Sequence, residues 1–274
     1  MSAEIPEITV AVNGALGRMG STVLSAAAAE EGVTPVGGAD IAASSDSVTI
    51  SGTSVSVPLA SGLTELFQTV KPDVVVDFTN GEAAKQAIIT CINAGVRVVS
   101  GSTGLSPEDL EEIRGLAAEK SVGVLSASNF ALGGVVLMHL VGIASKYFDY
   151  ADILESHHEM KVDAPSGTAL SIAEAMIEGR GSDFDQNVAD LQTLEGTRGG
   201  SFQGINVHSA RMPGRVARHE VVFGALGQTL TLIHDSINRD SFMPGVMLGV
   251  KHVVGQQELV VGLASVLGLG KSKP

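Results

Sequence analysis

Three glycines at every third position, Gly14, Gly17 and Gly20, constrain the fold of this chain more than any other feature. A short apolar segment precedes them at 8–12, and an Ala-rich segment with helical spacing follows at 21–30. Strand, glycine turn and helix in this order are a variant of the dinucleotide fingerprint, in which the turn lets the backbone approach a pyrophosphate at the helix N-terminus. A glycine-rich turn without a ligand fits the same residues, so the sequence around the turn has to decide.

The second predicted strand, at 34–39, ends at an acidic residue, Asp40. An acidic side chain at this place accepts hydrogen bonds from the ribose hydroxyls of a bound dinucleotide. Its charge repels the 2′-phosphate of NADPH, and Ile41 offers that phosphate no cation, whereas Arg18 has a side chain long enough to reach it. We therefore expect NADH or NADPH as the cofactor, with NADH favoured by less than about tenfold. The alternative is an exposed Asp without a ligand.

Beyond this turn, the first half of the chain continues to alternate strands and helices. Strands are predicted at 73–79, 95–100 and 122–125, and helices at 82–94 and from 106 onward. The alternation predicts a Rossmann-like, doubly wound parallel sheet, whose ligands bind outside the carboxyl ends of the strands. The polar strand ends should share one crevice with residues 14–19; they lie at 77–81, 101–104 and 127–130. Residues 42–62 are expected to form a loop or an edge hairpin.

After residue 130 the pattern changes. An apolar helix is predicted at 131–148, and residues 179–200, which have no strong period, are expected to be a surface loop. Alternating segments punctuated by glycine follow at 204–214, 216–223 and 228–234. They predict a second α+β domain with a mainly antiparallel mixed sheet.

The end of the chain is expected to return to the first domain. Residues 241–254 have a helical pattern and 258–262 a strand-like one. We therefore predict a dinucleotide-binding domain at 1–130, completed by 241–274, and a second domain at 131–240.

The stretch 155–168, Glu-Ser-His-His-Glu-Met-Lys-Val-Asp-Ala-Pro-Ser-Gly-Thr, gathers groups that transfer protons. His157, His158 and Lys161 supply imidazole and ammonium side chains, which suit acid–base work. A short strand is predicted before it at 152–155 and a helix after it, so the whole stretch is expected to be a strand-to-helix loop.

The helix after this loop is predicted to begin with an anion cradle. Ser166 is a good N-cap and Pro165 fixes the chain on entry, so the backbone N–H groups of Gly167 and Thr168 should point out of the helix unpaired. A carboxylate would bind well there. A solvated loop with an ordinary cap is the alternative for any isolated part of the motif, but the combination argues against it.

Charge and cysteine content exclude several classes of function. The formal net charge is -13, from 17 Lys and Arg against 30 Asp and Glu, which opposes general binding to nucleic acid or an anionic membrane. Cys91 is the only cysteine, so no internal disulfide can form, and no secretory signal or membrane-length apolar run is present. We expect a cytoplasmic protein.

A metal site is not expected. The histidines of the second half are scattered without metal-ligand spacing. Glu155, His157 and Glu159 could gather a metal ion, but alternating positions on an extended segment do not hold one well without other ligands.

These motifs together resemble one family, the dihydrodipicolinate reductases, also called 4-hydroxy-tetrahydrodipicolinate reductases, of diaminopimelate and lysine biosynthesis. The resemblance covers nearly the whole chain and is carried by residues 10–20, 77–79, 101–104, 129–130 and above all 155–168. The last of these is the most diagnostic, since the glycine turn alone fits many dehydrogenases.

The resemblance implies an enzyme that reduces the cyclic imine dicarboxylate 4-hydroxy-tetrahydrodipicolinate, with loss of water, to tetrahydrodipicolinate. By the same resemblance His157 is the acid/base and Lys161 a proton donor, while His158, Gly167 and Thr168 bind the substrate. Members are usually homotetramers that associate through the mixed sheet. The implied cofactor contacts are Gly14, Ala15, Leu16, Gly17, Arg18, Met19, Asp40, Gly101, Ser102, Thr103, Ala127, Ser128, Asn129 and Phe130.

Two other functions fit part of the sequence. Another two-domain nicotinamide dehydrogenase, acting on an amino acid or a sugar, would explain the glycine turn and the domain order. It would not explain the cluster of His157, Lys161 and 166–168. A regulator that senses dinucleotides would be expected to carry a basic DNA-binding module, which neither the charge nor the pattern offers.

Overall fold

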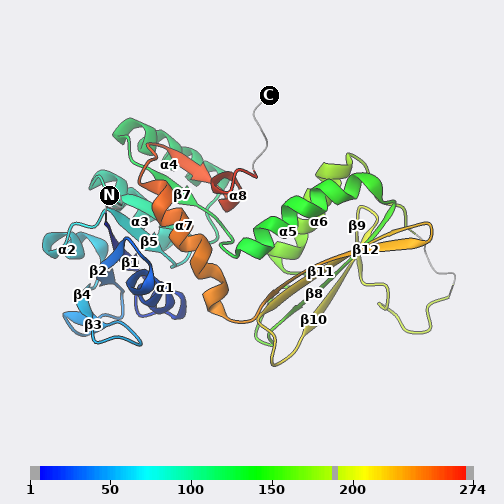
Figure 1. Cartoon of the computed structure of the whole chain (residues 1–274), viewed down its shortest axis with the longest axis horizontal. Helices are drawn as coiled ribbons and strands as arrows, with labels where there is room; N and C mark the ends of the chain where they lie inside the picture. Colours follow the sequence, from blue (N-terminus) through cyan, green and yellow to red (C-terminus); the bar gives the residue numbers. More distant parts are fainter. Residues whose placement is uncertain (1–6, 187–190, 270–274) are drawn as a thin grey trace, which may run out of the picture. The chain divides into compact units, whose positions relative to one another are not determined.

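The computed structural model describes residues 7–186 and 191–269, and the chain divides into two compact units (Figure 1). Unit 1 comprises Met1–Phe130 and Phe242–Pro274, and unit 2 comprises Ala131–Ser241. The chain therefore leaves unit 1 once and returns to it.

Unit 1 is built on an eight-stranded sheet in the order β13-β7-β6-β5-β1-β2-β4-β3. All neighbouring strands pair in parallel except β3, which is antiparallel to β4. The predicted Rossmann-like sheet is thus confirmed. Its strands are β1 (Ile8–Asn13), β2 (Val33–Ala39), β3 (Ser47–Thr49), β4 (Ser56–Ala60), β5 (Val74–Asp77), β6 (Arg97–Ser100), β7 (Val124–Ser126) and β13 (Leu259–Val261).

Helices cover both faces of this sheet. The helices α2, α3 and α4 pack on one face, and α1 and α7 pack together on the other, as Figure 1 shows. Because both faces are covered, the central strands are apolar throughout: Val74, Val75 and Val76 are all fully buried. The helices are α1 (Arg18–Ala29), α2 (Leu63–Thr69), α3 (Gly81–Asn93), α4 (Pro107–Lys120), α7 (Met243–Val253) and α8 (Leu263–Val266), with a 3₁₀ turn at Arg239–Phe242.

Two helices of unit 1 differ from what the sequence pattern predicted. Helix α1 begins at Arg18 and not at residue 21, because Gly17 already has extended backbone and serves as the N-cap. Helix α2 was not predicted: it is seven residues long, lacks a side-chain cap, and is held mainly by the buried side chains of Leu63 and Leu66. Helix α4 starts as expected, with a capping box between Ser106 and Asp109.

Unit 2 contains a five-stranded sheet in the order β12-β11-β8-β10-β9, in which only β8 and β10 pair in parallel. The predicted mixed, mainly antiparallel sheet is confirmed. Helices α5 and α6 lie side by side over one face of it (Figure 1). The elements are α5 (Leu132–Ala144), a 3₁₀ turn (Ser145–Tyr147), β8 (Tyr150–His157), α6 (Gly167–Arg180), β9 (Gly200–Phe202), β10 (Ile205–Arg211), β11 (Ala217–Ala225) and β12 (Gln228–Ser236).

Strand β8 is longer than the sequence suggested. It runs to His157, so Glu155 and His157 belong to the sheet and not to the loop that follows. Helix α6 continues to Arg180, past the expected start of a surface loop. Of that predicted loop, residues 187–190 lie outside the described part.

Alanine at Gly20 should destabilise the protein, while alanine at Gly115 should stabilise it. Both glycines lie in helices, but a Cβ on Gly20 would sit 2.0 Å from the carbonyl oxygen of Gly14, whereas one on Gly115 would meet nothing within 4 Å. We expect Gly20→Ala to lower the free energy of unfolding by about 1–3 kcal/mol and Gly115→Ala to raise it by roughly 0.5–1 kcal/mol. Urea unfolding measures both; equal effects would contradict the close packing of the glycine turn.

Candidate functional site

The helix-facing side of β8 changes from apolar to polar along the strand. Ala151 and Ile153 are buried in the core beneath α5 and α6. Since alternate residues of a strand share a face, Glu155 and His157 continue the same row, and both are also buried. The polar end of this row therefore lies inside the protein, where every charge needs a partner.

The neighbouring strands supply these partners. Register places Ser209 of β10 and His219 of β11 on either side of Glu155, and Arg211 beside His157. Arg211 binds the Glu155 carboxylate through two hydrogen bonds, Nη1 to Oε2 and Nη2 to Oε1, each 2.8 Å. No role was predicted for Arg211 or His219, because both lie more than 50 residues from His157 along the chain and are brought close to it only by strand pairing.

Glu155 also binds the predicted acid/base residue. Its Oε2 lies 2.6 Å from Nδ1 of His157, and its Oε1 accepts the backbone N–H of Ser166 at 3.1 Å. Burial alone would raise the pKa of Glu155, but the hydrogen bonds from His157 and Arg211 outweigh it and hold the pKa well below the usual range. Glu155 is therefore an ionised carboxylate at neutral pH.

Ser166 links this cluster to α6. Its hydroxyl accepts the N–H of Ala169 at 3.2 Å, which confirms the predicted N-cap. The same hydroxyl lies 3.2 Å from Nε2 of His219. Together with the N–H bonded to Glu155, these contacts fix the start of α6 against β8 and β11.

His219 is held neutral next to His157. The two rings meet edge to face, with centroids 5.2 Å apart at 74°. Burial lowers the pKa of His219 to about 4, and positive charge on His157 and Lys161 lowers it further. His219 is therefore an uncharged ring packed against His157.

The loop between β8 and α6 corrects one expectation. The Lys161 ammonium, whose Nζ is 2.7 Å from Oδ1, binds the Asp163 carboxylate, and the N–H of Gly167 faces the same carboxylate and helps to lower its pKa. The Lys161 hydrogen bond is the larger cause of the lowered pKa of Asp163, and the Gly167 N–H adds to it. A carboxylate thus occupies the predicted cradle, but it comes from the chain itself. Of the other predicted residues, His158 is exposed and Thr168 is half-buried.

Unit 1 contains a separate cavity of about 460 Å³ beside the glycine turn. Its wall includes Gly14, Gly17 and Asp40, together with Ile41 and Thr79. It lies at the carboxyl ends of β1, β2 and β5, where an open parallel sheet binds its ligands. The structure thereby brings together the glycine turn and the predicted ribose acceptor.

The glycine turn leaves no room for side chains. Gly14 has φ of 79°, in the left-handed region that favours glycine, and a Cβ there would lie 3.2 Å from the carbonyl oxygen of Phe78. Asp40 accepts the backbone N–H groups of Leu16 and Ala42, both at 2.9 Å, so it fastens the turn to the end of β2. Ile41, beside it, is 98% exposed.

Ala15, Leu16, Arg18 and Met19 of the predicted cofactor residues are not among those that line this cavity, and neither are the remaining ones, which follow β6 and β7. The segment after β6 is held by Asp77, a fully buried carboxylate that was predicted only as part of a polar strand end. Its Oδ2 accepts the hydroxyls of Ser100 at 3.0 Å and Ser102 at 2.8 Å, and its Oδ1 accepts Nδ2 of Asn13 at 2.8 Å. Asp77 therefore joins the ends of β1, β5 and β6. These remaining residues are Gly101, Ser102, Thr103, Ala127, Ser128, Asn129 and Phe130.

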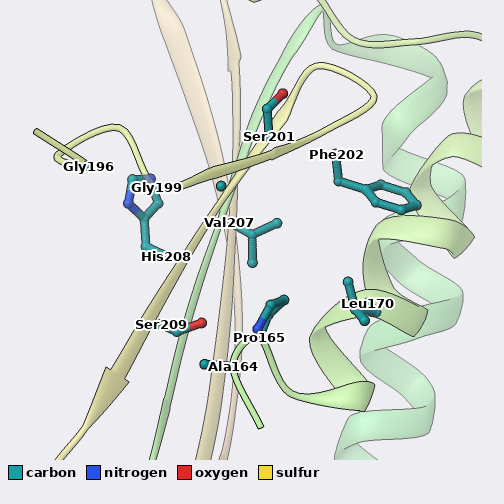
Figure 2. A pocket seen from close by; sticks show the side chains of 11 residues that line it. Ala164, Pro165, Leu170, Gly196, Gly199, Ser201, Phe202, Val207, His208 and Ser209 are labelled. Carbon is teal, nitrogen blue, oxygen red and sulfur yellow. The ribbon is translucent and has the colours of Figure 1, made fainter.

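A cavity of about 580 Å³ lies in unit 2 and is lined in part by the loop before α6 (Figure 2). Ala164, Pro165 and Leu170 form one side of it, and Phe202 and Val207 face them. Its described lining residues are mostly small or apolar, and His208 is the one among them with an ionisable side chain.

Two features are absent from the described residues. Over 7–186 and 191–269, no three His, Cys, Asp or Glu side chains are grouped so that they could hold a metal ion. In the same residues, no helix combines the length and the apolar character needed to cross a membrane.

Comparison with known proteins identifies the family. The model for the N-terminal part of dihydrodipicolinate reductase matches residues 8–130, and the model for its C-terminal part matches 133–267. The chain belongs to the dihydrodipicolinate reductase family. This confirms the resemblance seen in the motifs and makes the protein an oxidoreductase.

Individual family members match along nearly their whole length. The 4-hydroxy-tetrahydrodipicolinate reductase of Dehalococcoides mccartyi (strain CBDB1) is 42% identical over 262 residues, which cover 96% of this chain and 99% of the relative. That of Listeria monocytogenes serotype 4b (strain CLIP80459) is 41% identical over 261 residues, covering 94% and 99%.

Solved structures agree with the family assignment. Dipicolinate-bound dihydrodipicolinate reductase from Paenisporosarcina sp. TG-14 superposes with a TM-score of 0.84 at 38% identity, covering 94% of this chain and 99% of that one. An amine dehydrogenase from Mycobacterium smegmatis has a TM-score of 0.64 at 15% identity, covering 94% and 95%. The second likeness shows the fold alone.

Replacing His219 by Gln should make the protein less sensitive to acid. The pKa of His219 is about 4 in the folded protein against 6.5 for a free side chain, so between these values only the unfolded chain binds the proton. The stability linked to this group is present above pH 6.5 and is lost as pH falls toward 4. The slope reaches at most ~1.4 kcal/mol per pH unit.

Urea unfolding of both proteins at about pH 7.5, 6 and 5 checks this expectation. The free energy of unfolding should fall more steeply with acid in the wild-type protein than in His219→Gln. Parallel declines would show that His219 is not held neutral.

Proposed function

We propose that the protein catalyses the NADH- or NADPH-dependent reduction of 4-hydroxy-tetrahydrodipicolinate to tetrahydrodipicolinate, a step of lysine and diaminopimelate biosynthesis. The observation that carries the proposal is the buried ionic cluster around Glu155 and His157, set beside Lys161 and the start of α6. The names of the relatives, which match over 94% or more of the chain, support the same reaction.

Unit 2 is proposed to bind the substrate. A dicarboxylate needs local positive charge in a chain of net charge -13, and Lys161 with the first N–H groups of α6 supplies it. In the structure Asp163 makes these contacts, so we propose that one substrate carboxylate takes its place between Lys161 and the N–H of Gly167. His158 and Thr168 flank this position in the sequence and complete the proposed substrate contacts.

His157 and Lys161 are proposed to manage the proton. Addition of a hydride to a conjugated imine places negative charge on the substrate, which a nearby proton source stabilises. His157 is anchored from behind by Glu155, and Lys161 is an ammonium group beside the carboxylate cradle. One of these two groups donates the proton, and the other can assist the loss of water as acid or base.

Unit 1 is proposed to hold the cofactor, which supplies the hydride when it is bound. The glycine turn fits a pyrophosphate, because the backbone at Gly14 is left-handed and a Cβ at Gly17 would lie 3.2 Å from the Gly14 carbonyl oxygen. Asp40 still has acceptor capacity for ribose hydroxyls beyond its two bonds to backbone N–H groups. The residues after β6 and β7 are proposed to contact the remainder of the cofactor.

We further propose a homotetramer that associates through the sheet of unit 2. The face of this sheet opposite α5 and α6 exposes Leu154 of β8 and Ile233 of β12. Exposed apolar side chains of this kind suit contact with further copies of the chain.

Removing either proton-transfer group should abolish most of the activity. Purified protein is mixed with enzymatically generated 4-hydroxy-tetrahydrodipicolinate, and oxidation of NADH is followed by absorbance. His157→Gln and Lys161→Ala should each lower kcat about 100- to 10,000-fold, the usual range for one positioned acid–base group. Lys161→Ala should also raise KM, because the same ammonium pairs with a substrate carboxylate.

Binding of NADH should be nearly unchanged in both variants, since both residues belong to unit 2. This separates a chemical defect from a general loss of structure. If the wild-type protein oxidises neither NADH nor NADPH above the blank, the proposed reaction is wrong. A loss below threefold in both variants would remove these residues from the chemistry.

Cofactor choice should depend on the balance between Asp40 and Arg18. Asp40→Asn removes the charge that repels a 2′-phosphate but keeps an oxygen for the backbone N–H groups, so kcat/KM with NADPH should rise relative to NADH. Arg18→Ala should weaken the binding of NADPH more than that of NADH, because only NADPH has the 2′-phosphate that Arg18 can contact. An exposed charge contact of this kind is worth roughly 0–1 kcal/mol. In the native protein NADH should be preferred by less than about tenfold, or ~1.4 kcal/mol. A hundredfold preference for NADPH would show that Asp40 does not face the ribose.

A further inference from the structure

The carboxylate of Glu155 stands directly behind His157 and has no access to solvent. Its side chain is 0% exposed, and its Oε2 lies 2.6 Å from Nδ1 of the imidazole. A group sealed in this way does not touch a substrate. Any contribution of Glu155 to the reaction is therefore indirect and acts through the residues that it binds.

The hydrogen bonds around Glu155 decide where the proton of this pair lies. The guanidinium of Arg211 donates to both carboxylate oxygens, and the N–H of Ser166 donates to Oε1. A protonated carboxyl would turn one oxygen into a donor, which would conflict with these contacts. Glu155 is therefore an acceptor on both oxygens, and the hydrogen between it and His157 belongs to Nδ1.

We propose that Glu155 is a positioning residue that holds His157 in the tautomer with hydrogen on Nδ1, so that Nε2 is the nitrogen that exchanges a proton with the substrate. Within the part of the chain that the structure describes, Nε2 makes no hydrogen bond that would compete with this exchange. In protein sites the hydrogen bond made by one ring nitrogen sets the state of the other. The statement that Nε2 exchanges a proton with the substrate rests on the proposed function, whereas the assignment of the tautomer does not.

Arg211 and Ser166 fix Glu155 from two further elements. Besides the carboxylate, Arg211 binds the carbonyl oxygen of Ala210 at 2.7 Å and that of Asp163 at 2.6 Å. Arg211 therefore ties β10 to the loop, while Ser166 ties the start of α6 to the same carboxylate. With β8 itself, three segments hold the carboxylate whose Oε2 faces Nδ1 of His157, so the acceptor for this nitrogen is fixed in place.

The first test locates the hydrogen in the wild-type protein. Two-bond ¹H–¹⁵N spectra of protein labelled at its histidine nitrogens, recorded near pH 9 where an ordinary imidazole is neutral, distinguish the two tautomers. The His157 signals are assigned by their loss in His157→Gln. We expect a protonated Nδ1 and a bare Nε2. A ring protonated on Nε2 alone would overturn the proposal, whatever the kinetics show.

The second test removes the fixed acceptor. In Glu155→Gln the amide offers His157 either an oxygen or an NH₂ group, so both tautomers should appear in the spectra. We expect kcat to fall about 100-fold or more, with KM changed less than about threefold, since the substrate contacts remain. The matched control is Asp149→Asn, which neutralises another Arg-paired carboxylate of unit 2, bound to Arg180 at 3.2 Å, and should retain wild-type activity.

Each result assigns a cause. Loss of activity in Glu155→Gln with an unchanged Nδ1–H signal would make Glu155 merely structural and would overturn the proposal, as would a loss below threefold. If Glu155→Gln does not fold, the wild-type spectra still decide. If the wild-type protein shows no reductase activity, the proposed function fails while the spectra continue to test the tautomer.

Discussion

A buried carboxylate must be fully paired, and this requirement at Glu155 organises the functional end of unit 2. Leaving a charge of this kind without its partner typically costs about 3–5 kcal/mol. The chain meets the requirement with donors from three places: His157 on the same strand, Arg211 on β10 and the backbone of Ser166 at the start of α6. The end of the sheet and the start of the helix are consequently fixed by the same group that orients the imidazole.

The second constraint is charge. The chain as a whole is strongly acidic, so a dianion is not attracted by its overall field. Binding must come from short-range contacts, and Asp163 shows that the positive groups at the start of α6 already hold one carboxylate. In the proposed complex, an incoming carboxylate would replace an existing contact of the same chemical type. Specificity then depends on what the rest of the ligand adds, which favours a molecule with a second anionic group.

The sequence predicted the fold well because local pattern and tertiary packing agree along most of the chain. The buried strand over Val74–Asp77 and the capping box at Ser106 are local signals that no other part of the chain opposes. Helix α2 had no such signal: it is short, has no side-chain cap, and owes its stability to the burial of Leu63 and Leu66. Its existence therefore depends on contacts that a sequence does not display.

The candidate site was predictable only where its residues are neighbours in sequence. The motif around His157 and Lys161 is contiguous, but Arg211 and His219 reach it through the register of β10 and β11, which sequence pattern alone does not set. The polarity of Glu155 and His157 also disguised the end of β8, since a buried row of a strand is normally apolar. A polar interruption of such a row costs stability unless it is paired, which is why it marks a candidate functional site here.

The two units use different means to prepare for their proposed ligands. Around Gly14 unit 1 presents backbone, and the fit depends on the absence of side chains. Around His157 unit 2 presents side chains whose protonation states are set by burial and by charge partners: an ionised Glu155, a neutral His219 and a paired Lys161. A backbone cradle does not titrate, whereas this cluster does. The pH dependence of the reaction should therefore arise from unit 2, while substitutions in the glycine turn act through shape at every pH.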